Sequence, residues 1–223
     1  MVRLFIVMLA LVHFVSPSYA IGSADMQFDE NVATDLKSQV VNDFSFLESI
    51  QASKASPIHQ TTFGTVSGAN YLQWFNKRVL FFGVDTCGGS TAVACVDPAF
   101  KNKIWVTDNY IQISHPQIAR LMTLYHEARH TEEENDNWPH AKCPSNFKPT
   151  SIWTGAKLNN EYACDDTAYG SYSSASVMLN NISKFCTNCS AKVKADAKLY
   201  SDDQVKRVID NTAIQQLAVD FAF

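Results

Sequence analysis

Two histidines four residues apart constrain this chain more than any other feature of its sequence. His126 and His130 form the pattern H-E-x-x-H with Glu127 between them. On a helix both imidazoles lie on one face and can reach one metal ion, while Glu127 can act on a metal-bound water. Ser114 suits the N-cap of this helix and Pro116 its first turn. Apolar residues precede the pattern at helical spacing: Ile118, Leu121, Met122 and Tyr125.

The remaining segments predict a small sheet followed by helices. Helices are expected over 34–50, 70–77 and 159–181. Strands are expected over 78–84, 92–96 and 103–107, with a continuation over 110–113. Ser201 with Gln204 fits the capping box of a last helix, and 52–67 has the composition of a loop. The expected class is α+β, with a small mixed sheet, then the H-E-x-x-H helix, then a mostly helical C-terminal half.

The first twenty residues predict a secretory signal peptide. A short basic start precedes an apolar run from Leu4 to Val15, and Ala20 suits the cleavage site. The run is too short to span a membrane comfortably. We therefore expect an exported protein, extracellular or periplasmic, in which residues 1–20 are removed. Residues 21–223 then form a single domain, with 21–60 inside it or as an N-terminal helical extension.

Composition argues against some classes of partner. An apolar content of 46% is that of a globular chain, so disorder is not expected. The formal net charge of −4 argues against nucleic acid or an anionic membrane as the main partner, because both attract basic proteins.

All six cysteines follow the predicted signal peptide. An even number in an exported chain indicates three disulfides, whose pairing the sequence leaves open. Closure of short loops favours Cys87–Cys95, Cys143–Cys164 and Cys186–Cys189. The last pair, in a C-x-x-C pattern, is also compatible with a redox pair or half a metal site. A Cys143–Cys164 bridge would hold the segment around His140 against the H-E-x-x-H helix.

Two histidines do not complete a catalytic zinc site, which usually has three protein ligands and an open position for water. Three residues further along the chain are candidates: Asp166, His140 and Glu161. Asp166 and Tyr169 are three apart, so a helix or turn puts both on one side. There the carboxylate can bind the metal and the phenol can donate to a developing oxyanion. His140 offers an imidazole, a preferred zinc ligand.

The segment from His126 to Gly170 resembles the aspzincin metallopeptidases, the deuterolysin-like and peptidyl-lysine metalloendopeptidases. That family combines H-E-x-x-H with a G-T-x-D-x-x-Y-G element. Asp166, Tyr169 and Gly170 match the second half of this element, whereas the G-T half differs. The resemblance implies a zincin-like fold, one Zn²⁺ ion held by His126, His130 and Asp166, and a catalytic Tyr169 that stabilises the transition state.

Two looser resemblances imply other third ligands. Metzincins place a third histidine after H-E-x-x-H, a position that His140 would take, although the glycine turn of that family is missing here. The run Asn160-Glu161-Tyr-Ala-Cys-Asp165 resembles the glutamate helix of gluzincins, in which Glu161 would bind zinc. The third ligand therefore stays open between Asp166, His140 and Glu161.

The expected function is that of a secreted zinc metalloendopeptidase acting on protein or peptide substrates. Glu127 would accept a proton from the zinc-bound water and pass it to the leaving amine. The acidic run Glu132–Glu134 with Asp136 would favour basic side chains near the cleft. The alternative is an exported non-catalytic metal-binding or structural disulfide-linked domain, in which Asp166 and His140 both join the H-E-x-x-H pair in a closed site.

Overall fold

The computed structural model describes residues 26–112 and 114–223, so the expected signal peptide lies outside the described residues. The described chain has a mixed α+β architecture, which confirms the expected class. Its elements are β1 (Gln27–Phe28), α1 (Thr34–Ser49), α2 (Pro57–Phe63), α3 (Gly68–Asn76), β2 (Phe81–Val84), β3 (Ala94–Cys95), β4 (Lys103–Val106), α4 (Asp108–Gln112), α5 (Gln117–Arg129), the 3₁₀ helix η2 (Glu133–Asn135), β5 (Ala141–Lys142), β6 (Tyr162–Cys164), α6 (Ser171–Phe185), α7 (Ala191–Val205) and α8 (Asn211–Ala222).

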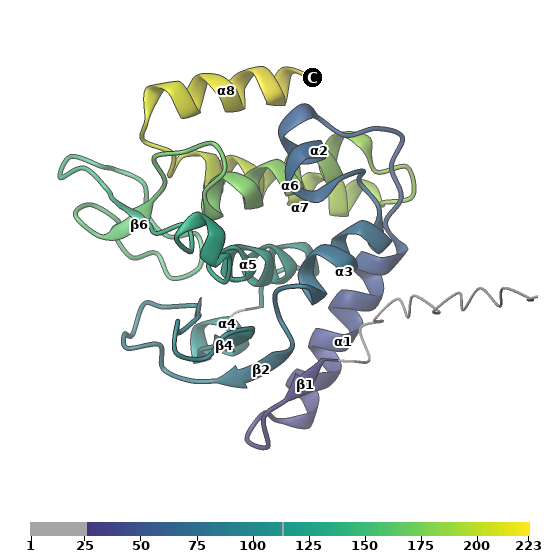
Figure 1. The fold of residues 1–223 in the computed structure, drawn as a ribbon, viewed down its shortest axis with the longest axis vertical. Coiled ribbons are helices and arrows are strands. Elements are labelled where there is room, and N and C mark those ends of the chain that lie inside the picture. Colours follow the sequence, from purple (N-terminus) through teal and green to yellow (C-terminus); the bar gives the residue numbers. More distant parts are fainter. Residues whose placement is uncertain (1–25, 113) are drawn as a thin grey trace, which may run out of the picture.

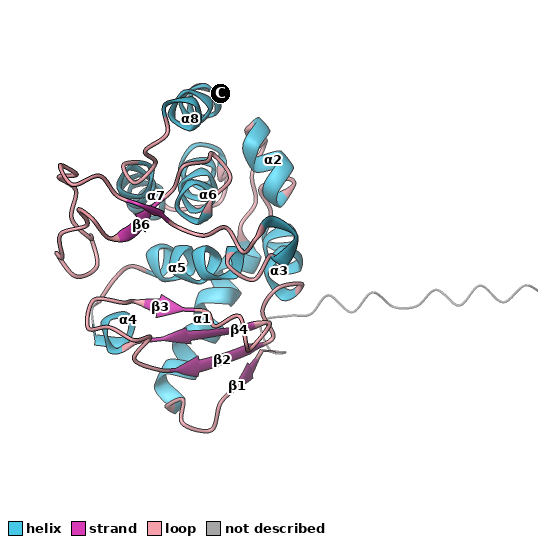
Figure 2. Cartoon of the chain, turned by 60° about the vertical axis from the view of Figure 1, so that its left-hand side comes forward, coloured by secondary structure: helices cyan, strands magenta, loops and turns pink. Residues whose placement is uncertain are grey.

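Helix α5, which carries the H-E-x-x-H pattern, lies at the centre of the molecule. In Figures 1 and 2 the larger sheet lies on one side of α5 and the C-terminal helices α6, α7 and α8 lie on the other. Helix α5 contacts β3 and β4 on the first side and α6 and α7 on the second. Because both sides of α5 are covered, almost all of its residues are buried.

The larger sheet has the strand order β1-β2-β4-β3. Strands β1, β2 and β4 are parallel, and β3 runs antiparallel to β4 with Ala94 opposite Val106. The inward side chains of the two central strands, Phe82, Ile104 and Val106, are fully buried. The short strand β3 lies at one edge of this sheet. Both β3 and its neighbour β4 contact α5.

Aromatic packing fixes the position of α5 against the N-terminal helices. The ring of Tyr125 stacks on Trp74 at 5.3 Å and meets Phe75 at the same distance. Its hydroxyl donates a hydrogen bond of 2.6 Å to the carbonyl of Tyr71. All four side chains are buried, and aromatic burial of this kind contributes several kcal/mol of stability. The apolar residues that precede His126 in α5 thus pack into the core, and the histidines lie on another face of the helix.

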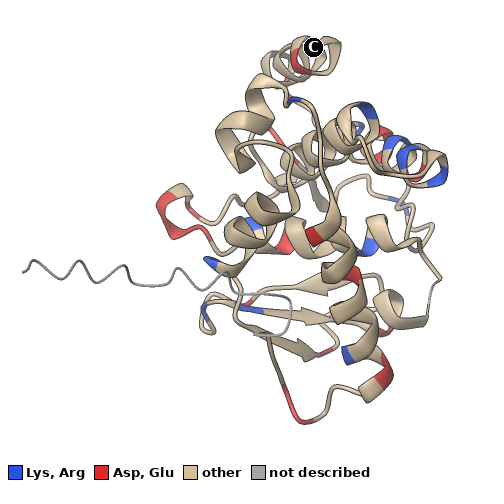
Figure 3. Cartoon of the chain, turned by 90° about the vertical axis from the view of Figure 1, so that its right-hand side faces the viewer, with Lys and Arg blue, Asp and Glu red and all other residues tan. Residues whose placement is uncertain are grey.

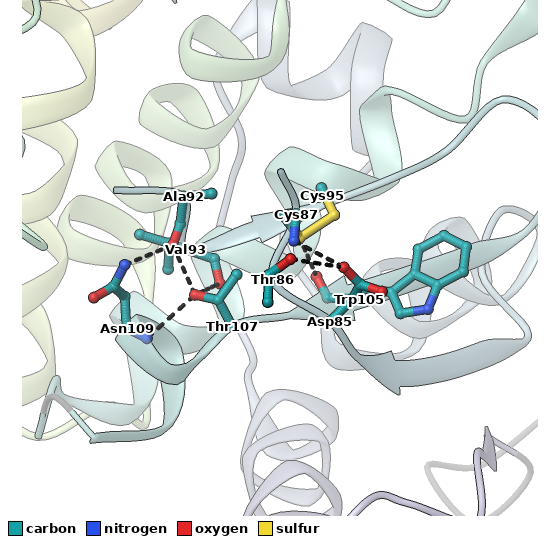
Figure 4. Close-up of a disulfide and its surroundings, with 9 residues drawn as sticks. All are labelled: Asp85, Thr86, Cys87, Ala92, Val93, Cys95, Trp105, Thr107 and Asn109. Carbon is teal, nitrogen blue, oxygen red and sulfur yellow. Dashed lines mark hydrogen bonds between the residues drawn. A yellow bond between two sulfur atoms is a disulfide. The ribbon is translucent and has the colours of Figure 1, made fainter. Parts of the chain in front are cut away.

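The three expected disulfides, Cys87–Cys95, Cys143–Cys164 and Cys186–Cys189, are all present. Such bridges are typical of proteins that fold in an oxidising compartment. Figure 4 shows that Cys87–Cys95 closes the loop between β2 and β3 beside Trp105. Farther along this loop, the hydroxyl of Thr107 donates 2.7 Å to the carbonyl of Ala92. The disulfide and this hydrogen bond together fix the conformation of the loop.

Five expectations for secondary structure were wrong. Helix α5 begins at Gln117 with Pro116 at its N-cap position, so Ser114 is not the N-cap and Pro116 is not in the first turn. Residues 57–63 of the expected loop form α2, which begins at Pro57 because proline suits the first helical position. Residues 108–112 form α4 instead of continuing the sheet. The expected helix over 159–181 is divided into β6, a turn and α6, which starts after Gly170. Ser201 lies inside α7.

The side chain of Ser201 explains the last of these errors. Its hydroxyl donates 2.9 Å to the carbonyl of Ser176 and so joins α7 to α6 instead of capping a helix. The capping roles belong to Ser190 at the start of α7 and to Asp210 at the start of α8. A buried helix-to-helix hydrogen bond and a capping box use the same residue type, so the local sequence does not separate them.

Charged residues are distributed over the whole described chain. Figure 3 shows acidic and basic positions on the sheet side and on the C-terminal helices, with neither sign confined to one half. Within residues 26–112 and 114–223, no helix has both the length and the apolar character needed to cross a membrane.

Candidate metal centre

Three histidines converge at the C-terminal end of α5. The Nε2 atoms of His126 and His130 are 3.3 Å apart, those of His126 and His140 3.2 Å, and those of His130 and His140 3.1 Å. Three nitrogen atoms bound to one zinc ion at about 2.0–2.1 Å with tetrahedral angles would be about 3.3 Å apart. The triangle therefore has the size that a single metal ion requires. The three form a group of residues that could hold a metal ion.

Hydrogen bonds to the other ring nitrogens leave lone pairs facing this triangle. Nδ1 of His130 lies 2.9 Å from the carbonyl of Asn137, which can only accept, so this nitrogen carries the proton. Nδ1 of His140 lies 3.4 Å from Oδ1 of Asp165 and is protonated for the same reason. The Nε2 atoms of both rings are then bare. Bare nitrogens so close together repel unless a cation lies between them, so the residues fit a metal ion.

The surroundings keep the imidazoles of His126 and His130 in the neutral form that binds metals. Burial, and after it the neighbouring His140, lowers the pKa of His130 to about 4. Burial and then the other two rings hold the pKa of His126 well below its usual value. Neutral imidazole is the ligand form of histidine, so no proton has to be displaced from these rings near pH 7.

A disulfide-linked hairpin brings the third histidine to α5. His140 precedes β5, Asp165 follows β6, and the two strands pair antiparallel. The Cys143–Cys164 bridge joins the two strands of this hairpin. Cys143 follows His140 closely in sequence and Cys164 directly precedes Asp165, so the bridge holds the segments of His140 and Asp165 together. The expected bridge beside the site is thus present, while its effect on metal binding is a prediction.

Asp165 is fixed by its own contacts. It is buried, and its Oδ2 accepts a hydrogen bond of 2.9 Å from the backbone N–H of Ser173 on α6. Its carboxylate also lies against Gly170, where an added Cβ would come within 2.4 Å of Oδ2. The glycine that matches the D-x-x-Y-G element is therefore needed for close approach of this carboxylate.

The structure separates the three sequence candidates for the third ligand. His140 lies with His126 and His130, whereas Asp166 and Glu161 are outside the group that could hold a metal in the described chain. Asp166 is exposed in the bend that follows β6, whereas its neighbour Asp165 is buried. Glu161 is exposed at the rim of the cleft, and its carbonyl accepts from the N–H of Cys143.

Tyr169, the expected catalytic tyrosine, is half-buried against a separate apolar cluster. That cluster joins α6 to α8 through residues such as Val177 and Leu217. The carbonyl of Tyr169 accepts a hydrogen bond of 2.5 Å from Arg129, which anchors the end of α5. The contacts of Tyr169 thus belong to packing, and another tyrosine lies beside the histidines.

Tyr172 is the aromatic residue of the site that sequence reasoning missed. Its ring lies 4.3 Å from that of His126 and stacks on His140 at 4.6 Å. On this ring lies the guanidinium of Arg207, with Cζ 4.4 Å from the ring centre. Burial raises the pKa of Tyr172, and Arg207 opposes that rise through its charge and a hydrogen bond. Gly170 is the sequence signal for this position, because a helix that begins after Gly170 has Tyr172 in its first turn.

Glu127 is buried beside its histidine neighbours and lines the same cleft. Burial raises the pKa of its carboxyl group to about 8. A carboxyl group whose proton affinity is raised in this way is suited to take up and release protons near neutral pH. The geometry thus provides three nitrogen ligands and one adjacent acid–base group.

A cleft of about 750 Å³ opens over the histidines. Its walls come from the disulfide-closed loop 87–96, the segment 151–158 and the first turn of α6. A smaller hollow of about 210 Å³ adjoins His130 and is lined partly by the acids Asp97, Glu133 and Glu134. The expected acidic run is thus partly at the site, so a preference for basic side chains stays a prediction.

Glu132, the first residue of that run, is buried and has a different role. Its carboxylate accepts from Arg78 at 2.7 Å, Arg129 at 2.6 Å and the indole of Trp138 at 2.7 Å. These contacts fix the loop that ends at Asn137, whose carbonyl orients His130. Second-layer contacts of this kind set the direction of a ligand nitrogen.

No protein-family model, curated protein or solved structure matches the chain.

We expect removal of the Cys143–Cys164 bridge to weaken zinc binding. The double variant Cys143→Ser, Cys164→Ser should lose about 3 kcal/mol of stability and bind zinc about tenfold more weakly, because His140 and Asp165 are no longer held together. Competition with a fluorescent chelator measures the affinity. The double variant Cys186→Ser, Cys189→Ser is the control, since that bridge is not part of the metal-centre hairpin. Unchanged zinc affinity in the first variant would refute this role.

Proposed function

We propose that the protein is a zinc-dependent peptidase of the zincin type, with His126, His130 and His140 as metal ligands. The observation that carries this proposal is the triangle of Nε2 atoms 3.1–3.3 Å apart on a helix that also presents Glu127. A zinc ion held by these three histidines would keep a position for water, would lower the pKa of that water to roughly 7 and would polarise a carbonyl group.

The residues around the triangle supply the other requirements of peptide hydrolysis. Glu127 takes the proton of the attacking water and delivers it to the leaving nitrogen, a role that its raised pKa favours. The ring of Tyr172 lies against His126 and His140, and we assign to its hydroxyl the role of donating to the oxyanion. This role replaces the one that the sequence resemblance gave to Tyr169.

An extended substrate has a matching edge in the cleft. Strand β3 is the edge strand of the larger sheet, and Ala94 and Cys95 line the cleft beside the histidines. An unpaired strand edge binds an extended peptide through main-chain hydrogen bonds without selecting its sequence. The Cys87–Cys95 bridge holds this edge in place. Peptide is therefore the substrate class that fits the cleft.

The alternative from the sequence, a closed four-ligand site in a non-catalytic protein, has less support. It needs the carboxylate of Asp166 beside His140, whereas Asp166 is exposed and lies outside the histidine group. A site with three ligands keeps the position at which water and substrate bind.

Metal removal tests the proposal directly. We expect the purified protein to cleave members of a mixed peptide library, with products identified by mass spectrometry. Dialysis against 1,10-phenanthroline should abolish cleavage, and one equivalent of zinc should restore it, because the water and carbonyl lose their activating charge without metal. Cleavage that survives complete zinc removal, or the absence of cleavage in the zinc-loaded protein, would refute the peptidase.

A further inference from the structure

Arg207 differs in its charge pairing from the other arginines of the described chain. Each of the others forms an ion pair with a nitrogen–oxygen distance of 2.6 or 2.7 Å: Arg78–Glu132, Arg129–Glu132 and Arg120–Asp43. The ion pair of Arg207 with Asp203 is 3.8 Å long, and the Nε of Arg207 is buried without a hydrogen-bond partner. Only 7% of the Arg207 side chain is exposed. A buried guanidinium with no close counter-ion is costly, which indicates that a ligand supplies the missing anion.

Its position places that anion beside the metal centre. The guanidinium of Arg207 lies over one ring, Tyr172, whose neighbours are the rings of His126 and His140. Arg207 also lines the cleft that contains the histidines and Glu127. The ring of Tyr172 lies 4.4 Å from Cζ of Arg207 and 4.3 Å from the ring of His126. At about 3.3–3.6 Å per extended residue, an anion on Arg207 lies within about three residues of a carbonyl at the metal centre.

The backbone of Arg207 is rigidly tied to the same centre. Its carbonyl accepts a hydrogen bond of 2.9 Å from the N–H of Asp165, and the carbonyl of Asp165 accepts 2.9 Å from the N–H of Ile209. Asp165 also orients His140. The guanidinium and a metal ligand are thus attached to one short hydrogen-bonded ladder, which is the preorganisation that a specific binding group needs.

We propose that Arg207 forms a carboxylate-binding subsite of the cleft, and that the preferred substrates are peptides with a carboxylate within about three residues of the cleaved bond. A planar guanidinium binds a carboxylate through two parallel hydrogen bonds. The carboxylate comes either from the C-terminus of the peptide or from an Asp or Glu side chain. The substrate preference rests on the proposed peptidase function, whereas the carboxylate-binding subsite does not.

Two matched peptide pairs distinguish the sources. One pair has the same sequence with a free C-terminus or a C-terminal amide, and the other is blocked at both ends with Glu or Gln next to the cleaved bond. We expect the carboxylate member of at least one pair to have a kcat/KM about 30-fold higher, and Arg207→Gln to remove that preference. Arg207→Lys should restore part of it. No preference in either pair, or a preference that survives Arg207→Gln, overturns the proposal.

Ligand binding tests the subsite without turnover. Titration calorimetry of the zinc-loaded protein compares glutarate with its monoamide, which lacks one carboxylate. Glutarate should bind at least about tenfold more tightly, and Arg207→Gln should abolish the difference. Lys157→Gln is the control, because Lys157 lines the same cleft but is exposed, so it should retain the difference. A protein that cleaves no peptide yet passes this test keeps the subsite and loses the peptidase, and equal binding of both ligands rejects the subsite.

Discussion

Replacing Glu127 with Gln should lower peptidase kcat by about 10³-fold while leaving one zinc ion per chain. The substitution keeps the size and shape of the side chain and removes its ability to accept a proton, a contribution of about 10²–10⁴ in general acid–base catalysis. Zinc content should not change, because the three imidazoles form the ligand triangle without Glu127. Steady-state kinetics on a peptide from the library, with metal analysis of the same sample, measures both quantities.

The control for this variant is Glu161→Gln. Glu161 lines the same cleft and has the same side chain, but it is exposed at the rim, so its replacement should change kcat less than about threefold. An active Glu127→Gln protein would mean that another group moves the proton. A Glu127→Gln protein that has lost its zinc would mean that the carboxylate is a ligand, and the assignment of roles would then be wrong.

Substitutions at positions 140, 165 and 166 should have graded effects on zinc affinity. We expect His140→Ala to weaken it by more than about 100-fold, because a first-layer ligand is lost. Asp165→Asn should weaken it by about 10–100-fold, since the amide no longer orients and polarises the imidazole of His140. Asp166→Asn should have no measurable effect, because this side chain is exposed and outside the histidine group.

The neighbouring pair Asp165 and Asp166 makes this series informative. The two substitutions remove one carboxylate each, one residue apart, so a difference in net charge cannot explain a different outcome. Circular dichroism confirms that each variant is folded before its affinity is measured. If Asp166→Asn loses zinc and His140→Ala keeps it, the ligand set implied by the aspzincin resemblance is right and the one proposed here is wrong.

Local patterns were sufficient for the central helix and for the disulfides. The apolar spacing before His126 reflects a real buried face, so α5 begins at Gln117, within three residues of the expected start. The three bridges close the three shortest loops, for which chain connectivity alone favours the pairing. In both cases the determining interactions are between residues close in sequence.

The rest of the site depends on contacts that a local pattern does not contain. The expected helix over 159–181 placed Asp166 and Tyr169 on one face, whereas β6 and a turn give Asp165 and Tyr172 to the metal centre. Gly170, which lies against the Asp165 carboxylate, is the one local sign of this arrangement. Arg207 reaches the site through backbone pairing with Asp165 across the fold, and nothing near it in sequence indicates that contact.

X-ray absorption spectroscopy of the zinc-loaded protein tests most directly whether one ion is held by three imidazoles. The account predicts four ligands at about 2.0–2.1 Å, with imidazole scattering from three of them and a fourth oxygen from water. The spectrum should lose one imidazole in His140→Ala and should be unchanged in Asp166→Asn. A spectrum with two imidazoles in the native protein, or one that changes on substitution of Asp166, would contradict the account.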